Sequence, residues 1–208
     1  MPKLVDPVER RERIVGAVLR LVARDGFAGA SLRNVATESG LNIGSVRHYF
    51  TSHSELLIFA MTAMVERVSA RLVGRVAAAA GWERRPVAER RDLALAALAE
   101  LLPLDDARRA EVAVFVEFTA SARTDPALAD VARHAAEGTR ELVGRIVARH
   151  VGAGGLRPGL DPELETARLW ALVDGVSTQA VLQPDLVPPD TCRRVVDLHL
   201  RSLEPDAG

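Results

Sequence analysis

The sequence is poor in cysteine and in aromatic residues: of its 208 residues one is cysteine, and 4% are aromatic. A single thiol, Cys192, excludes a disulfide within the chain and indicates a reducing compartment, so we expect a cytoplasmic protein. A buried, inert thiol is the favoured reading of Cys192, and a redox switch is the alternative. Ala, Leu, Val and Arg dominate the composition, which favours helix over strand.

Long apolar runs are also missing. In the predicted fourth helix the longest uncharged apolar run is 56–65, ten residues, against roughly 18 for a membrane span. Charged residues interrupt the first segment at 10–13, so we expect neither a signal peptide nor a membrane partner. The 48% of hydrophobic residues nevertheless suffices to bury a core.

Common catalytic motifs are absent as well. The chain holds no G-x-S-x-G, H-E-x-x-H or C-x-x-C and no glycine-rich phosphate loop. His48 and His53 are five positions apart and straddle a helix break, which argues against a metal site. We therefore expect no catalytic residues, no cofactor and no metal, and an enzyme of unrecognised type is the weaker alternative.

Apolar residues recur at helical spacing along the whole chain, and no stretch alternates with a period of two. Ser31, Asn42 and Asp161 are predicted N-caps, and Ser52 with Glu55 predicts a capping box. The expected fold is all-α with about nine helices: a three-helix helix-turn-helix domain over 1–51 and a helical ligand-sensing and dimerisation domain over 52–208. The predicted helices cover 8–24, 31–39, 42–50, a long segment from 52, 86–102, 105–123, 126–151, 162–182 and 189–203.

Two short predicted helices around Gly40 carry the functional signal. Ala36 is small where the helices would touch, Gly40 permits a left-handed turn, and Val46 follows six residues later. This spacing is typical of a helix-turn-helix, whose second helix enters the DNA major groove. Residues 1–53 hold eight Lys/Arg and five acidic residues, a net charge of +3 against −4 for the rest, which fits a polyanion-binding end. A helix corner without DNA is the alternative.

The polar side chains of this segment are the candidate DNA contacts. Arg47 is the candidate for a bidentate bond to guanine, with a phosphate or solvent role as the alternative. Phosphate contacts are predicted for Ser31, Arg33, Tyr49 and His53; the alternatives are simple packing for Tyr49 and a surface position at a helix start for His53. The second helix would approach base edges through the small and donor residues Asn42, Gly44, Ser45 and His48.

These residues resemble the DNA-binding domain of the TetR family of bacterial repressors over 10–57. Two positions depart from the family pattern: Arg47 replaces a usual tyrosine, which resembles the branch of choline- and pyrimidine-responsive regulators, and His53 replaces a usual lysine. The matching positions are Ser31, Ala36, Gly40, Tyr49, Phe50, Ser52, Glu55, Leu56 and Leu57.

The resemblance implies an effector cavity in the C-terminal helices. Polar or aromatic residues on mostly apolar helices are the candidates to line it, and plain core packing or solvent exposure is the alternative for each. The sparse aromatics argue against a full aromatic cage for choline. The candidates are Phe59, Met64, Phe115, Glu117, Phe118, Trp170, Asp174 and Thr178, with Thr119, His134 and Gln179 as further polar groups.

The resemblance also implies a homodimer formed through the last two helices. Apolar stripes from Leu169 to Ala180 and from Val195 to Leu203 can form a four-helix bundle across a two-fold axis, or can be buried within one chain. The predicted function is a DNA-binding transcriptional regulator, a repressor by family default, released from a palindromic operator in double-stranded DNA by a small-molecule effector. A ligand-independent DNA-packaging protein is the main alternative.

Overall fold

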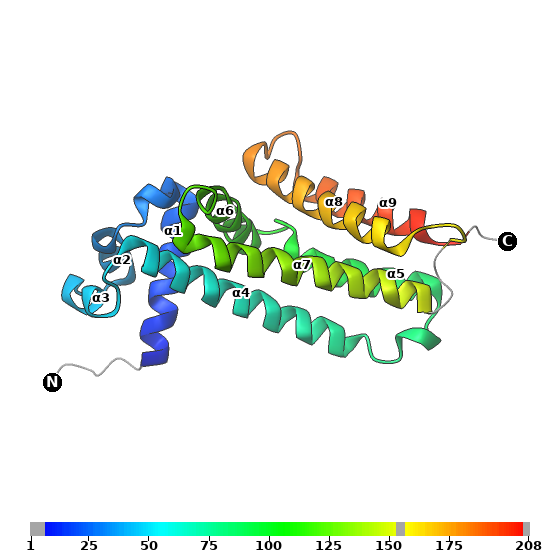
Figure 1. Ribbon diagram of the computed structural model, residues 1–208, viewed down its shortest axis with the longest axis horizontal. Helices are drawn as coiled ribbons and strands as arrows, with labels where there is room; N and C mark the ends of the chain where they lie inside the picture. The colour runs from blue at the N-terminus through cyan, green and yellow to red at the C-terminus, as the bar shows by residue number, and fades with distance from the viewer. Residues whose placement is uncertain (1–6, 153–156, 206–208) are drawn as a thin grey trace. The chain divides into compact units, whose positions relative to one another are not determined.

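The computed structural model describes residues 7–152 and 157–205, and every regular element within them is helical. Within these two ranges, nine α-helices and two short 3₁₀ helices follow one another (Figure 1), which confirms the predicted all-α fold. No described helix combines the length and apolarity that crossing a membrane requires. The helices are α1 Pro7–Gly29, α2 Leu32–Ser39, α3 Ile43–Tyr49, α4 His53–Ala78, η1 Trp82–Arg84, α5 Val87–Leu98, η2 Ala99–Leu101, α6 Asp106–Ser121, α7 Pro126–Gly152, α8 Pro162–Leu182 and α9 Pro189–Leu203.

Side chains at the helix starts accept hydrogen bonds from the backbone N–H groups that have no partner inside the helix. The Ser31 hydroxyl accepts from the Asn34 N–H at 3.2 Å, and the Asn42 side-chain oxygen accepts from Ser45 N–H at 2.6 Å. The Asp161 carboxylate does the same at the start of α8. All three predicted N-caps are confirmed. Gly26 takes φ 68° and ψ −177°, so the regular part of α1 ends at the predicted place.

The start of α4 differs in one respect from the predicted capping box. The Ser52 hydroxyl accepts from the Glu55 N–H at 3.1 Å, as expected. The Glu55 carboxylate, however, accepts from the backbone N–H and the hydroxyl of Thr51, one residue before Ser52, at 2.7 and 2.9 Å. These hydrogen bonds from Thr51 favour the ionised form and lower the pKa of Glu55.

The described helices belong to two compact units, which we treat separately. Unit 1 comprises 1–67 and 113–133, and unit 2 comprises 68–112 and 134–208. The predicted boundary lay between residues 51 and 52. The structural grouping instead places the first part of α4, which includes the buried residues Leu56 and Met61, with the helix-turn-helix. Whether 1–51 and 52–208 are the functional domains stays a prediction.

Unit 1 has a compact aliphatic core. Val15 of α1, Val35 of α2, Val46 of α3 and Leu56 of α4 have no exposed surface, so each of the four helices contributes to it. Phe50, just after α3, is also buried, whereas Leu32 and Leu41 are half-buried.

Unit 2 has its own core, formed mainly by α5, α7, α8 and α9. Cys192 lies in this core with no exposed surface, and burial raises the pKa of its thiol. Both observations favour a buried, inert thiol over a redox switch. Trp82 opens η1, is buried, and packs edge-on against His150 with ring centres 5.0 Å apart.

A buried carboxylate joins three elements of unit 2. The side chain of Glu100, in η2, is 2% exposed and accepts hydrogen bonds from Arg71 and Arg75 of α4 and from Arg108 of α6. Burial works against ionisation, but the hydrogen bonds from Arg75 and Arg71 and the charges of Arg108 and Arg75 outweigh it, so the pKa of Glu100 lies below its usual value. Glu111 accepts from Arg71 at 2.6 and 3.0 Å and completes the network.

Candidate nucleic-acid interface

The turn between α2 and α3 has the geometry of a helix-turn-helix. Gly40 is left-handed, with φ 66° and ψ 25°, and its N–H donates to the carbonyls of Ala36 and Thr37. Ala36 is buried at 3% exposure and Val46 is fully buried, so both lie where the spacing predicts. A side chain larger than that of Ala36 would separate the two helices.

The guanidinium of Arg13 fastens α1 to this turn. Its Nε and Nη2 donate to the carbonyl of Ser39 at 3.0 and 2.7 Å, and Nη2 also donates to the carbonyl of Gly40 at 3.2 Å. A Cβ added at Gly40 would lie 2.9 Å from Arg13 Nη2. Glycine is therefore favoured at position 40 chiefly for its left-handed conformation, and a Cβ there would also push the end of the Arg13 side chain aside.

Two further arginines of α1 reach the end of α2. Arg20 donates to Glu38 at 2.7 Å, and Arg24 lies 3.6 Å from the same carboxylate. The hydrogen bond from Arg20 lowers the pKa of Glu38. These pairs are exposed, so they guide the packing of α1 against α2 more than they stabilise it.

The exposed side of α3 carries the predicted base-reading residues. Asn42, Gly44, Arg47 and His48 are exposed, and Ser45 is half-buried. The Asn42 side-chain oxygen is occupied as the N-cap, which leaves its amide N–H₂ group to donate to a partner. The arrangement presents donors and small residues together, as close approach to base edges requires.

Three predicted phosphate contacts lie on α2, at the N-cap before it, and on α4. Arg33 is exposed on α2, and His53 is exposed as the first residue of α4. Ser31 is half-buried and its hydroxyl already serves as the N-cap of α2.

Tyr49, the last residue of α3, has a partner that sequence reasoning missed. Its phenolic oxygen accepts a hydrogen bond from Arg10 Nη1 of α1 at 2.7 Å. The ring packs edge-on against His48, with centres 5.5 Å apart, and half of the residue is exposed. No local signal relates Arg10 to Tyr49, because 39 positions separate them.

Phe59 of α4 was expected to line the effector cavity, and the structure places it against the end of α3. Its ring centre is 5.1 Å from that of Phe50, and the guanidinium of Arg11 lies over the ring at 5.1 Å. Arg11 also pairs with Glu66 of α4 at 2.9 Å. Phe59 therefore links α1, α3 and α4 within unit 1.

The other expected cavity residues fall in both units. In unit 1, Met64 and Phe118 are buried, and Phe118 packs edge-on against Phe27 with centres 6.0 Å apart. Phe115 is half-buried, Glu117 is exposed, and the Thr119 hydroxyl donates to the carbonyl of Phe115. In unit 2, His134 and Gln179 are exposed.

Trp170, Asp174 and Thr178, also in unit 2, form a row on α8 because residues four apart share a helix face. All three are half-buried. The indole N–H of Trp170 is buried and has no hydrogen-bond acceptor. Burial raises the pKa of the Asp174 carboxyl. The Trp170 ring also packs against the core of unit 2, so the row combines an apolar wall, an unpaired donor and a desolvated carboxyl.

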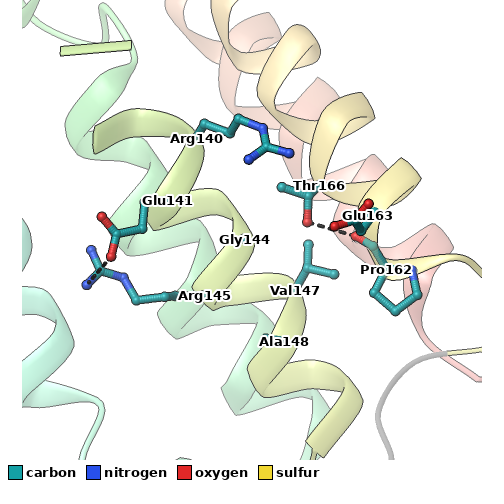
Figure 2. A pocket seen from close by; sticks show the side chains of 9 residues that line it. All are labelled: Arg140, Glu141, Gly144, Arg145, Val147, Ala148, Pro162, Glu163 and Thr166. Carbon is teal, nitrogen blue, oxygen red and sulfur yellow. Dashed lines mark hydrogen bonds and ion pairs between the residues drawn. The ribbon is translucent and has the colours of Figure 1, made fainter. Parts of the chain in front are cut away.

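A shallow hollow of about 390 Å³ also lies on unit 2, between α7 and the start of α8. Figure 2 shows its lining, which includes Arg140, Arg145, Glu163 and Thr166. None of the predicted effector residues borders it. Among the described residues no group of three or more His, Cys, Asp or Glu could hold a metal ion.

The geometry defines a helix-turn-helix DNA-binding protein, and comparison with known families agrees. Residues 14–58 match the family described as "Bacterial regulatory proteins, tetR family". Residues 90–204 match "BetI-type transcriptional repressor, C-terminal". The chain belongs to the TetR family and is a DNA-binding transcriptional regulator.

Individual relatives cover nearly the whole chain. The HTH-type transcriptional regulator PksA of Bacillus subtilis is 33% identical over 208 residues, which is 98% of this chain and 94% of PksA. A transcriptional regulator from Rhodococcus sp. RHA1 is 31% identical, with TM-score 0.75 over 93% of this chain and 95% of its own. A regulator from Saccharomonospora viridis, solved in complex with choline, shares the fold at TM-score 0.80 and 22% identity, over 93% and 96% of the two chains.

We predict that Gly40→Ala destabilises the protein by about 1–2 kcal/mol or more, because alanine is strained in the left-handed region and its Cβ meets Arg13. The matched control is Gly74→Ala, on α4, where a Cβ would have nothing within 4 Å. That change should stabilise by roughly 0.5–1 kcal/mol. Urea unfolding measures both, and equal midpoints for the two variants would refute the role of Gly40.

Proposed function

We propose that this regulator is a dimeric repressor that acts in the cytoplasm, reads a palindromic operator with two copies of α3, and is released by a small-molecule effector. The observation that carries the proposal is the exposed donor set of α3, fixed on a buried helix-turn-helix corner. In a dimer of this kind the two recognition helices enter successive major grooves roughly 34–36 Å apart.

Arg47 is the proposed base-reading residue. It is exposed on the last turn of α3, and its planar fork matches the two acceptors of a guanine edge. Asn42, Gly44, Ser45 and His48 allow close approach of the helix. Tyr49 and the phosphate candidates Ser31, Arg33 and His53 would fix its register on the backbone.

Selection of bound duplexes from a random DNA pool tests this proposal, and Arg47→Ala sharpens the test. The wild-type chain should enrich a palindrome. The variant should lose preference at one base of each half-site, a discrimination of about 1–3 kcal/mol. Arg33→Ala is the control: it should weaken all sequences uniformly and reduce the salt slope by about one. Uniform weakening by Arg47→Ala would make that residue a phosphate contact.

The dimer is proposed to form through α8 and α9. These helices form a hairpin (Figure 1) whose buried faces lie in the core of unit 2. Apolar side chains remain outside that core: Leu164 and Leu182 on α8, and Leu198 on α9, are exposed. A two-fold contact between two such hairpins would bury them and form a four-helix bundle.

We predict that Leu198→Glu converts the dimer to a monomer and weakens operator binding. Leu198 is 68% exposed in the single chain, so glutamate should not disturb the fold. Val73→Glu is the matched control, since Val73 is also 68% exposed but lies on α4. Sedimentation velocity distinguishes the two variants. A Leu198→Glu protein that remains dimeric would place the interface elsewhere.

The effector is proposed to contact the row of Trp170, Asp174 and Thr178 on α8. A carboxylate beside an indole ring is suited to a cationic group, through charge and a cation–π contact, and the Trp170 N–H could donate to an acceptor of the same ligand. The choline complex of the Saccharomonospora viridis regulator is consistent with such an effector. Met64, Phe115, Glu117 and Phe118 remain further candidates, and Phe59 is a weaker one because of its contacts with Phe50 and Arg11.

We predict that Asp174→Asn weakens the response to a cationic effector. Release should correspond to a coupling of about 1–3 kcal/mol, or a 5- to 150-fold loss of operator affinity. Quaternary ammonium compounds are the first probes, in equilibrium titrations on the selected operator. Because the pKa of Asp174 is raised, a cation should act less well as the pH falls and the carboxyl becomes neutral.

Asp185→Asn, at an exposed loop residue, is the control. An unchanged response in Asp174→Asn would exclude this contact.

A further inference from the structure

Arg10 of α1 and Tyr49 of α3 contact each other within unit 1, and the proposed DNA contacts give Arg10 no role. The Arg10 Nη1 donates to the Tyr49 phenolic oxygen at 2.7 Å, and the guanidinium carbon lies 5.7 Å from the ring centre. Tyr49 ends the recognition helix α3 and is half-exposed. It is also the only tyrosine in the chain.

The chemistry of the two groups decides where the tyrosine proton points. An arginine side chain can only donate hydrogen bonds, whereas a phenol both donates and accepts. Since Arg10 occupies an acceptor position of the oxygen, the O–H group must donate to something other than Arg10. Phosphate oxygens of DNA accept hydrogen bonds, so they are suitable partners. The positive charge of Arg10 also polarises the O–H bond and makes it a stronger donor.

The first turns of α1, which carry Arg10, are anchored on both sides of it. Arg10 lies three positions before Arg13, which binds the carbonyls at the turn. Its neighbour Arg11 pairs with Glu66 and covers the ring of Phe59. On the other side, the Tyr49 ring contacts His48 and Phe50, with centres 5.5 and 6.5 Å away. The ring is thus set by α3, and its hydroxyl is set by α1.

We propose that Arg10 is a positioning residue for DNA binding, which fixes the Tyr49 hydroxyl so that its proton is donated to a phosphate of the operator backbone. The inference rests on the proposed phosphate contact of Tyr49. It adds a function for the first turns of α1, which otherwise only pack against the helix-turn-helix and α4.

A double-mutant cycle on operator affinity tests the proposal. Tyr49→Phe removes the hydroxyl and should weaken binding about tenfold or more, since hydrogen bonds to charged groups stabilise by about 1.5–3 kcal/mol. Arg10→Met should weaken the wild-type protein about as much as Tyr49→Phe does. In the Tyr49→Phe background it should cost much less. Any general loss from removing a positive charge appears in both backgrounds and therefore cancels in the cycle. Arg10→Lys, which keeps a charged donor, should restore part of the affinity.

A measurement without DNA accompanies the cycle. Selective ¹³C labelling of tyrosine gives one Cζ resonance, because the chain has one tyrosine, and that resonance should shift in Arg10→Met while the circular dichroism and the melting temperature stay close to those of the wild type. Equal weakening by Arg10→Met in both backgrounds would show that Arg10 acts independently of Tyr49 and would overturn the proposal. Full operator affinity in Tyr49→Phe would show that the Tyr49 hydroxyl does not bind DNA, and it would overturn the proposal. The operator selection that tests the proposed function does not depend on this result.

Discussion

The guanidinium of Arg13 covers the carbonyl oxygens of Ser39 and Gly40, and the geometry of the DNA-binding unit depends on this contact. Carbonyls at a helix end need donors, and the guanidinium that supplies them lies 2.9 Å from where a Cβ at position 40 would stand, so a side chain there would push the end of Arg13 aside. Arg13 thereby fixes α1 relative to α2. On the same helix, Arg10 contacts Tyr49 at the opposite end of α3, and Arg11 contacts Phe59 of α4. One helix thus holds the recognition helix at its turn and at its last residue.

The two units use arginine in different surroundings. In unit 1 the arginine pairs are exposed, so they act through geometry, and the apolar core supplies most of the stability. In unit 2, Glu100 is buried among Arg71, Arg75 and Arg108, where removal of any partner leaves a charge with little water around it. The buried network thereby fixes the second part of α4 to η2 and α6.

Local signals in the sequence were sufficient for the helix-turn-helix and insufficient for the contacts that hold it. Ser31, Asn42, Gly40 and Asp161 act on backbone groups a few residues away, so their roles follow from sequence order. Arg13 and Arg10 act on residues 26 and 39 positions distant, and a charged residue on an amphipathic helix looks like any solvated side chain. Phe59 was assigned to a cavity because periodicity cannot distinguish an aromatic residue that lines a pocket from one that packs between helices. The apolar pattern predicted one helix over 86–102, whereas the structure has α5 followed by the 3₁₀ helix η2. Glu100 lies in η2, where it pairs with Arg71, Arg75 and Arg108.

Cys192 lies without exposed surface at the start of α9, and burial raises the pKa of its thiol. Alkylating reagents attack exposed thiolates, so the native thiol should be chemically silent while the protein is folded. A cysteine introduced at any exposed position would then be the single reactive site of the chain, with no need to remove the natural one. Pairs of spin labels or fluorophores attached in this way would report the separation of recognition helices in an assembly of otherwise unaltered subunits.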